Sequence, residues 1–307
     1  MTDPLISIVL CCYNGQRFIK QQIDSLLNQT YPNIEIIISD DASTDGTVSI
    51  LEEFKNEQRI QLFFQATNLG SSKNFEFAVE KTQGEFIAFS DQDDIWLPNK
   101  VQELYSAIGN SYLVYCDSEL INEQGEKLNR KISDLKRMYT GNETAGFILF
   151  NVVWGHAMMI RRALLPFILP IPPGIAHDIW IAFKAATISG IKYLDAPLTL
   201  YRQHESTATK TVAIRAKSRN MSQRYADFEK QLHWIEVIYN HERDSHKDFY
   251  NRLFTLYQRK KYERWVWQLF FFLMNHRKEM FMFTKKKWAS QVVEIFKQSK
   301  GVSKVSF

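Results

Sequence analysis

The sequence predicts an α/β fold built on a doubly wound, mostly parallel sheet, followed by a helical extension. Short apolar runs alternate with amphipathic stretches, beginning with Leu5–Cys12. Such alternation is typical of a parallel sheet that is covered by helices on both faces. Polar clusters end the first, second and fourth of these runs, and open α/β sheets bind ligands at the carboxyl ends of their strands. We therefore expect a ligand-binding α/β domain over residues 1–205 and a separate helical region over residues 206–307.

The first half of the chain alternates strand-like and helix-like segments. Leu5–Cys12 is nearly all apolar, as a strand buried on both faces must be, and the next segment has apolar residues at helical spacing. The expected strands are Leu5–Cys12, Ile34–Ser39, Ile60–Phe64 and Phe86–Ser90. The expected helices are Arg17–Gln29, a helix that Ser43 or Thr44 caps and that ends near Lys55, and Lys73–Lys81.

The later elements are less regular. We expect a helix at Asn99–Ile108 and a strand at Ser111–Asp117, then a polar hairpin or loop over residues 122–131. Asn151–Arg162 is strand-like, and a proline-rich loop leads into an apolar helix that ends near Ala186. Asp195–His204 is expected to be an edge strand, because Pro197 lies near its start.

Three carboxylates follow the fourth expected strand within four residues: Asp91, Asp93 and Asp94. Clustered acids repel one another, and a cation between them removes that penalty. Hard divalent cations such as Mg²⁺ or Mn²⁺ prefer carboxylate oxygens together with substrate phosphates. The acids therefore predict a metal–diphosphate site, with a solvated acidic turn as the alternative. Neither GxGxxG after the first strand nor GxxxxGK[ST] occurs, so a dinucleotide fold and a P-loop are not supported.

Composition points to a globular protein of a reducing compartment. Hydrophobic residues make up 45% and charged residues 23% of the 307 residues, which is ordinary for such proteins. The three cysteines lack metal-binding spacing, which favours buried thiols. No basic segment precedes the first apolar run and no apolar run is long enough to span a bilayer, so we expect neither a signal peptide nor a membrane helix. The expected location is the cytoplasm.

Charge divides the chain near Glu205. Residues 1–205 contain 17 Lys/Arg and 25 Asp/Glu, a net charge of −8, whereas residues 206–307 contain 21 and 9, a net charge of +12. The second region is expected to be helical over residues 214–239, 249–258 and 262–273, the last being amphipathic. Its basic and aromatic residues predict association with the inner face of the cell membrane; a contact with the catalytic domain or in a homo-oligomer is the alternative. Nucleic-acid binding is disfavoured because no recognised module accompanies the charge.

Three motifs carry a resemblance to a known family. Ile8–Asn14, Ser39–Thr47 and Ser90–Asp94 follow one another in this order. Together they resemble the successive motifs of family 2 glycosyltransferases with the GT-A fold, whose third motif is the metal-binding Asp-x-Asp. The resemblance covers about residues 5–205. It implies transfer of a sugar from a nucleoside diphosphate with the help of Mn²⁺ or Mg²⁺.

The resemblance implies roles for individual residues in binding the nucleotide sugar. Asp41 matches the carboxylate that accepts from the pyrimidine N3–H, and Cys11, where the family often has Thr or Ser, lines the base. Asp93 matches the metal-ligating aspartate, and Asp91 completes the motif and touches the ribose or the metal shell. The residues expected to bind the nucleotide sugar are Cys11, Tyr13, Asn14, Asp40, Asp41, Asn68, Asp91 and His204. For Asp40 and Asp41, a turn with a helix cap is the alternative.

The remaining assignments concern the base and the acceptor. Asp178 matches the family's catalytic base, with a helix N-cap as the alternative; the residue before it, often Glu or Gly in the family, is His177 here. His204 would reach the diphosphate or complete the metal shell, unless it is a solvated loop residue. Trp154, His156 and Trp180 are expected on the acceptor side, and for His156 a packing or hydrogen-bonding role is favoured over that of a base.

The expected reaction is a metal-dependent, inverting transfer onto a glycan or lipid-linked acceptor in cell-surface polysaccharide synthesis. The Ser90–Pro98 and Tyr201–His204 segments are similar to those of rhamnosyltransferases, which favours dTDP-rhamnose as donor over a UDP-hexose or UDP-galactofuranose. The alternative of another class is a non-catalytic nucleotide-sugar-binding scaffold, which the joint presence of Asp41, Asp93 and Asp178 disfavours. A nucleotidyltransferase is disfavoured too, because the Tyr13–Arg17 turn does not fit a phosphate loop.

Overall fold

The computed structural model describes residues 3–204, 220–241 and 246–302. The chain divides into two compact units, of which unit 1 comprises Met1–Thr144 and Asn151–Val212 and unit 2 comprises Ala145–Phe150 and Ala213–Phe307. The boundary expected between residues 205 and 206 lies outside the described residues. The short segment Ala145–Phe150 is part of unit 2 although it interrupts the sequence of unit 1.

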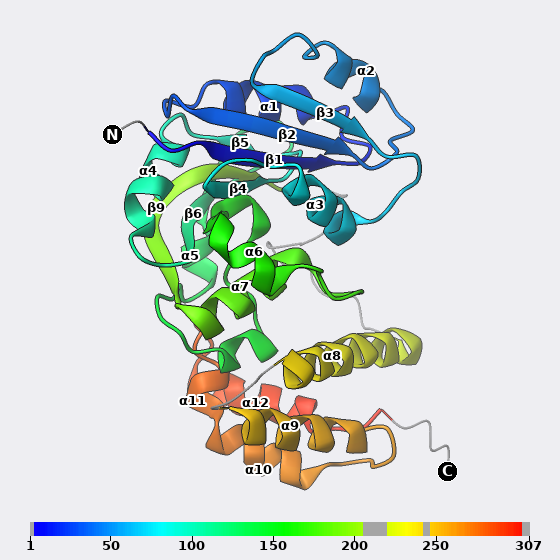
Figure 1. Ribbon diagram of the computed structural model, residues 1–307. Coiled ribbons are helices and arrows are strands. Elements are labelled where there is room, and N and C mark those ends of the chain that lie inside the picture. Colours follow the sequence, from blue (N-terminus) through cyan, green and yellow to red (C-terminus); the bar gives the residue numbers. More distant parts are fainter. Residues whose placement is uncertain (1–2, 205–219, 242–245, 303–307) are drawn as a thin grey trace. The chain divides into compact units, whose positions relative to one another are not determined.

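The described part of unit 1 contains a nine-stranded sheet in the order β3-β2-β1-β4-β8-β6-β9-β5, with β7 paired to β6 (Figure 1). Parallel pairing joins β1, β2, β3 and β4, as expected, and also β6 to β9. Antiparallel pairing of β8, β5 and β7 makes the sheet mixed. The strands are β1 (Ile6–Cys12), β2 (Ile34–Asp40), β3 (Ile60–Phe64), β4 (Phe86–Ser90), β5 (Ile95–Trp96), β6 (Leu113–Ile121), β7 (Lys127–Lys131), β8 (Met158–Arg161) and β9 (Ile191–Arg202).

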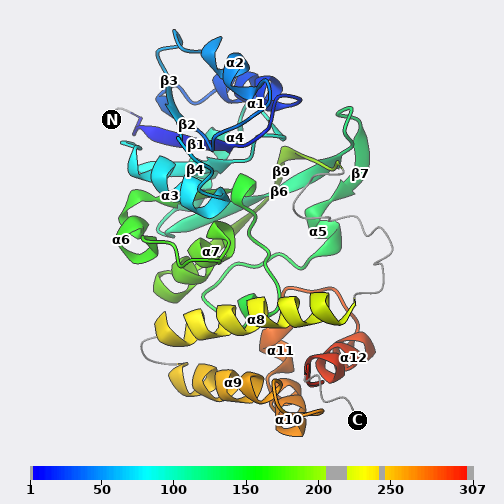
Figure 2. The same ribbon diagram turned by 90° about the vertical axis from the view of Figure 1, so that its right-hand side faces the viewer.

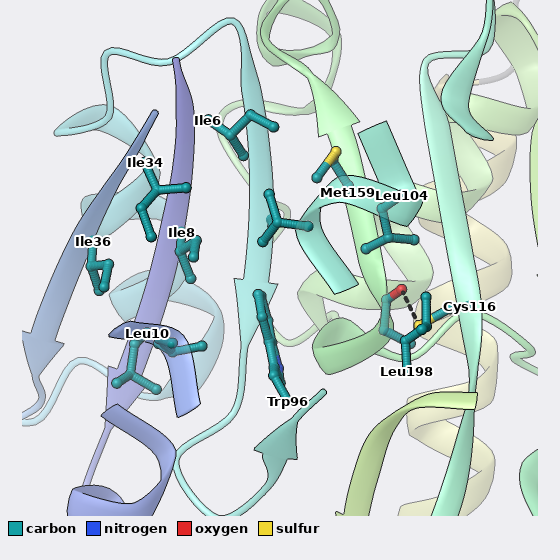
Figure 3. Packing of buried hydrophobic residues seen from close by; sticks show 14 of the residues in the cluster. Ile6, Ile8, Leu10, Ile34, Ile36, Trp96, Leu104, Cys116, Met159 and Leu198 are labelled. Carbon is teal, nitrogen blue, oxygen red and sulfur yellow. Dashed lines mark hydrogen bonds between the residues drawn. The ribbon is translucent and has the colours of Figure 1, made fainter. Parts of the chain in front are cut away.

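Helices cover both faces of this sheet, and the predicted α/β class is confirmed. Alternate residues of β1 and β2, such as Ile8 and Ile36, pack with Trp96 and with α1 and α4 in one core (Figure 3). On the other face Phe75 of α3 contacts Phe89 of β4, with ring centroids 5.8 Å apart. The α-helices of unit 1 are α1 (Ile19–Leu27), α2 (Thr47–Glu52), α3 (Ser71–Glu80), α4 (Lys100–Ile108), α5 (Ile132–Leu135), α6 (Leu165–Ile168) and α7 (His177–Ile188).

Three local expectations for unit 1 are wrong. Of the segment Asn151–Arg162, which was expected to be strand-like, only Met158–Arg161 forms a strand, because Gly155–Ala157 forms a 3₁₀ turn. β9 is not an edge strand, since β5 pairs with its outer side. Neither Ser43 nor Thr44 caps α2; instead Asp45 Oδ1 accepts a hydrogen bond from the Thr47 N–H at 3.0 Å.

Unit 2 is helical in its described part. α8 and α9 lie side by side, and α10 contacts α12 (Figures 1 and 2). Trp234 of α8 donates its indole N–H to the Phe147 carbonyl at 2.9 Å, which ties Ala145–Phe150 into this unit. The helices are α8 (Met221–His241), α9 (Lys247–Arg259), α10 (Trp267–Asn275), α11 (Arg277–Met280) and α12 (Trp288–Gln298).

The amphipathic helix expected over residues 262–273 begins later, at Trp267. The residues before it pair with residues near the end of α12 instead: Trp265 forms a β-bridge with Lys300, and the Val266 N–H donates to the Ser299 carbonyl at 3.0 Å. These contacts replace the first turn of the expected helix. Among the described helices, no segment combines the length and the hydropathy needed to cross a membrane.

Candidate active site

The acid turn, Asp91–Asp94, lies between β4 and β5 and joins residues from several parts of unit 1. Asp94 is fully buried, and its Oδ1 accepts a hydrogen bond from the Arg202 N–H of β9 at 3.0 Å. Its Oδ2 accepts no hydrogen bond from the described residues. Burial and the neighbouring charges of Asp93 and Asp91 raise the pKa of Asp94 well above its usual range. A buried carboxylate oxygen without a donor favours a cation as its partner.

His156 faces the same carboxylates from the turn before β8. Its Nδ1 lies 3.5 Å from Asp94 Oδ2 and 3.6 Å from Asp91 Oδ2. Its Nε2 lies 2.9 Å from the Ser118 Oγ on β6, and its ring stacks on Tyr201 with centroids 4.4 Å apart. Burial lowers the pKa of His156, which favours the neutral imidazole that binds metals. Asp91, Asp94 and His156 each offer one ligand atom, and these atoms lie within 4.8 Å of one another.

Asp93 belongs to a second pair on the same turn. Its Oδ2 lies 2.7 Å from His204 Nε2, and the Arg202 Nε–H donates to the Asp93 carbonyl at 2.8 Å. The rings of Phe18 and His204 lie 5.1 Å apart, and the Arg202 guanidinium lies 4.6 Å from the Phe18 centroid. The end of β9 therefore holds His204 beside the acid turn. The expected pair of Asp91 and Asp93 is divided between two groups, Asp91 with Asp94 and His156, and Asp93 with His204.

The loop after β1 is bonded to both neighbouring motifs. The Tyr13 N–H donates to Gln92 Oε1 at 2.8 Å, and Gln92 Nε2 donates back to the Tyr13 carbonyl at 3.1 Å. Asn14 has a positive φ of 51°, and its Oδ1 accepts from the Thr44 N–H at 2.8 Å. Cys11 is nearly buried beneath this loop, and Tyr13 is exposed. The three expected motifs thus meet at one edge of the sheet.

The two aspartates after β2 differ in their surroundings. Asp40 accepts from the Ser43 N–H at 2.9 Å and from the Ser43 Oγ–H at 2.5 Å, so it forms the turn that the alternative interpretation expected. Asp41 accepts from the N–H groups of Leu69 and Gly70 at 2.7 and 2.9 Å, and Asn68 Nδ2 donates to the Asp41 carbonyl at 3.2 Å. A carboxylate retains further lone pairs after two hydrogen bonds, so Asp41 keeps the capacity to accept from a ligand.

Asp178 lies in the first turn of α7, but it is not the N-cap residue, which is Ala176. Its Oδ1 accepts from the Ile179 N–H at 2.7 Å, and its Oδ2 accepts from Asn151 Nδ2 at 2.9 Å. Burial, together with the charge of Asp91, raises the pKa of Asp178 to about 7. The ring of His177, the residue before Asp178, lies 5.9 Å from the ring of Phe89 at the end of β4, so the start of α7 lies close to the acid turn. A carboxylate with a pKa near neutrality suits proton transfer at that pH.

The three residues expected on the acceptor side are all buried in unit 1. Trp180 is buried and donates its indole N–H to the Ile168 carbonyl at 2.8 Å, and its assignment to the acceptor side stays a prediction. His156 packs beneath the acid turn, and Trp154 is buried with only 8% of its surface exposed. Trp154 belongs to the hydrophobic core that also contains Trp96. A cavity of about 600 Å³ lies in unit 2 between α9 and α10, and no predicted site residue lines it.

Two polar residues of the site carried no signal in the sequence. Asn151 orients Asp178, and its own Oδ1 accepts from the Val153 N–H at 2.9 Å. Lys100 is fully buried and donates to the His156 carbonyl at 2.6 Å and to Thr199 Oγ1 at 2.7 Å. Burial lowers the pKa of Lys100 to about 8. In the sequence, Lys100 looks like any lysine of an expected helix, and only the structure shows that it is buried.

Comparison with known proteins agrees with this geometry. The model of glycosyl transferase family 2 matches residues 7–168. An uncharacterized glycosyltransferase of a Nostoc species is 30% identical over 290 residues, which are 85% of this chain and 86% of the relative. The Escherichia coli UDP-Glc:alpha-D-GlcNAc-diphosphoundecaprenol beta-1,3-glucosyltransferase WfgD is 37% identical over 127 residues, 40% of this chain and 49% of WfgD. The structure of Staphylococcus aureus TarS, residues 1–349, in complex with UDP-GlcNAc has a TM-score of 0.59 at 16% identity and covers 96% of this chain and 81% of TarS.

Proposed function

This chain belongs to glycosyl transferase family 2, and on that premise we propose that it transfers a sugar from a nucleoside diphosphate onto a cell-surface glycan or its lipid-linked precursor. The observation that carries the proposal is the acid turn with its clustered ligand atoms and with Asp178 nearby at the start of α7, where the rings of His177 and Phe89 lie 5.9 Å apart. The likeness to WfgD, whose name includes a diphosphoundecaprenol-linked acceptor, supports the lipid-linked precursor.

The possible metal ligands at and around the acid turn fit Mn²⁺ or Mg²⁺. Carboxylates suit both ions, and the imidazoles of His156 and His204 suit Mn²⁺ better. Asp91, Asp94 and His156 offer three ligand atoms close together, and Asp93 of the same turn pairs with His204, which follows β9. These residues would hold a divalent cation, which would supply neutralisation of the charge that develops on the diphosphate as the bond to the sugar breaks.

Asp178 is the proposed catalytic base. It accepts the proton of the acceptor hydroxyl as that oxygen attacks the anomeric carbon from the face opposite the diphosphate. Asn151 and the Ile179 N–H each donate to one carboxylate oxygen, and these two bonds fix the plane of the carboxylate. One base and one displacement invert the anomeric configuration, so no covalent sugar intermediate is needed.

The base of the nucleotide is proposed to bind at Asp41, where N3–H of uracil or thymine donates to the carboxylate. Because both bases carry this group, Asp41 does not distinguish UDP from dTDP donors. WfgD is named for UDP-glucose and the TarS complex holds UDP-GlcNAc, which supports a UDP-hexose. The similarity of Ser90–Pro98 and Tyr201–His204 to rhamnosyltransferase segments supports dTDP-rhamnose as the second candidate.

The test is release of nucleoside diphosphate from UDP-glucose, UDP-GlcNAc, UDP-galactose, UDP-galactofuranose and dTDP-rhamnose, with a membrane extract as the source of acceptor. Release from one donor is expected, and Asp178→Asn should lower it by roughly 100-fold or more, the usual contribution of a general base. Asp195→Asn is the matched control, because Asp195 is an exposed carboxylate on β9. Turnover of no donor, or full activity of Asp178→Asn, would contradict the proposal.

A further inference from the structure

Unit 2 carries a cluster of aromatic side chains at its surface, which we call the aromatic face. The Trp265 and Phe296 ring centroids lie 4.5 Å apart, and Trp265 and Trp267 stack at 5.7 Å. Phe270 connects to Phe271 at 5.5 Å and to Phe296 at 6.4 Å. The aromatic face consists of Trp265, Trp267, Phe270, Phe271 and Phe296, so these contacts join it into one continuous cluster.

The outer part of this cluster is open to solvent. Trp267 is 53% exposed, Phe271 66% and Phe296 42%. α10 buries Leu269 and Leu273, on its other side, in the core of unit 2. Trp267 and Phe271, which lie one turn apart, are therefore not part of that core. Exposed apolar side chains that gather in one place mark a binding surface more often than scattered ones do.

Positive charge borders the aromatic face. Arg264 precedes Trp265, Lys297 follows Phe296, and Lys300 forms the β-bridge with Trp265. All three are exposed, and none forms an ion pair with another described residue. The nearest acids in sequence are already paired, Glu263 with Arg259 at 2.5 Å and Glu294 with Lys286 at 3.2 Å. The aromatic face is thus bordered by three exposed cations.

We propose that the aromatic face and its three cations bind the surface of an anionic lipid bilayer. Tryptophan and phenylalanine rings enter the boundary between headgroups and acyl chains, and nearby cations contact the anionic headgroups. Exposed positive charge around an apolar surface complements a negatively charged leaflet, and each basic residue close to such a surface strengthens binding roughly fivefold. Docking of this kind places the enzyme where a lipid-linked acceptor is displayed. Only this purpose of membrane binding, and not the binding itself, depends on the proposed function.

Sedimentation with lipid vesicles tests the proposal on the full chain, without donor or acceptor. Vesicles of phosphatidylcholine with phosphatidylglycerol are compared with vesicles of phosphatidylcholine alone. The variants are Trp267→Ser with Phe271→Ser, and Arg264→Gln with Lys297→Gln and Lys300→Gln. Phe167→Ser is the matched control, because Phe167 is 48% exposed on α6 and lies in unit 1. Each variant changes surface side chains, and its melting temperature verifies that it is folded.

The wild-type chain is expected to sediment with the anionic vesicles and to be released by salt. The triple cation variant should bind roughly 100-fold more weakly, from the fivefold effect of each cation, and the double aromatic variant should lose at least tenfold. Phe167→Ser should bind like the wild type. Equal binding to neutral vesicles, or unchanged binding of both variants, would overturn the proposal. So would absence of vesicle binding together with a dimer that Trp267→Ser with Phe271→Ser dissociates, because a second copy would then cover the aromatic face.

Discussion

Asn151→Ala should shift the pH dependence of sugar transfer, because it removes a hydrogen bond to the proposed base. In the wild type, Asn151 Nδ2 donates to Asp178 Oδ2 at 2.9 Å and thereby lowers the Asp178 pKa against the larger effect of burial, which raises it to about 7. A hydrogen bond to a charged group contributes about 1.5–3 kcal/mol, and one pKa unit corresponds to about 1.36 kcal/mol. The substitution should therefore raise the Asp178 pKa by roughly one to two.

The consequence for activity follows from the fraction of Asp178 that is ionised. Near pH 7 about half of the wild-type carboxylate is deprotonated, whereas in Asn151→Ala this fraction falls to roughly a tenth or a hundredth. We expect kcat at pH 7 to drop about 5- to 50-fold and to recover toward the wild-type value at about pH 9.

The assay is kcat against pH with the donor that the wild type turns over. Asn33→Ala is the matched control, since Asn33 Nδ2 donates to the Asp3 carbonyl at 2.8 Å, near the amino terminus. A loss of the same factor at every pH would mean that Asn151 only maintains structure. An unchanged profile would refute the reasoning that Asn151 acts on Asp178.

Three further predictions concern the surroundings of the site. Chelation by EDTA should abolish transfer, and added Mn²⁺ should restore it. Asp94→Asn should need at least tenfold more Mn²⁺ than the wild type, because the buried Oδ2 of Asp94 is a proposed ligand atom. Activity that persists in EDTA contradicts the metal assignment. Lys100→Met should lower the free energy of unfolding in urea by about 1–3 kcal/mol, since it leaves the His156 carbonyl without its donor; unchanged stability contradicts that reasoning. Trp180→Phe should destabilise the fold by about 1–3 kcal/mol, because the indole N–H no longer donates to the Ile168 carbonyl, and should leave the KM for acceptor unchanged; a raised KM would support the expected acceptor-side role of Trp180.

Burial of Asp178 also predicts how stability depends on pH. The pKa of Asp178 is higher in the folded chain than in the unfolded chain, where an ordinary aspartate titrates near about 4. The folded state therefore binds this proton more tightly, and the contribution of Asp178 to stability is present below about pH 4 and is lost as the pH rises toward 7. In thermal melts from pH 5 to pH 8, Asp178→Asn should lose less stability than the wild type. An equal slope for both would show that Asp178 titrates normally in the fold.

The fold of the first half was predictable because periodicity and strand burial agree. β1, β2 and β4 are buried along their whole length, and apolar runs of this kind have few other solutions. The 155–157 turn was not predictable in the same way, because its conformation depends on placing His156 beneath Asp94, a contact between distant parts of the chain. β9 read as an edge strand for a similar reason, since its partner β5 contributes only two residues.

The site was predictable at the level of motifs and less so at the level of atoms. Acids after β4 indicated a cation, but the sequence could not show that they form two groups. His156 comes to Asp91 and Asp94 from the turn before β8, and His204 comes to Asp93 from the end of β9, so both groups depend on contacts between distant parts of the chain. Asn151 had no motif at all. Amphipathic spacing indicated an apolar surface in the C-terminal region, whereas the start of α10 was set by the bridge from Trp265 to Lys300.

The anomeric configuration of the product tests the proposed mechanism most directly. Transfer to a defined acceptor is followed by proton NMR, and the coupling at the anomeric centre of the new linkage is compared with that of the donor. A single displacement with Asp178 as base predicts the opposite configuration to the donor, with the signal absent in Asp178→Asn and present in Asp195→Asn. Retention of the donor's configuration would contradict the account, because it would require either a nucleophile of the enzyme that forms a covalent sugar intermediate or attack from the same face as the departing diphosphate.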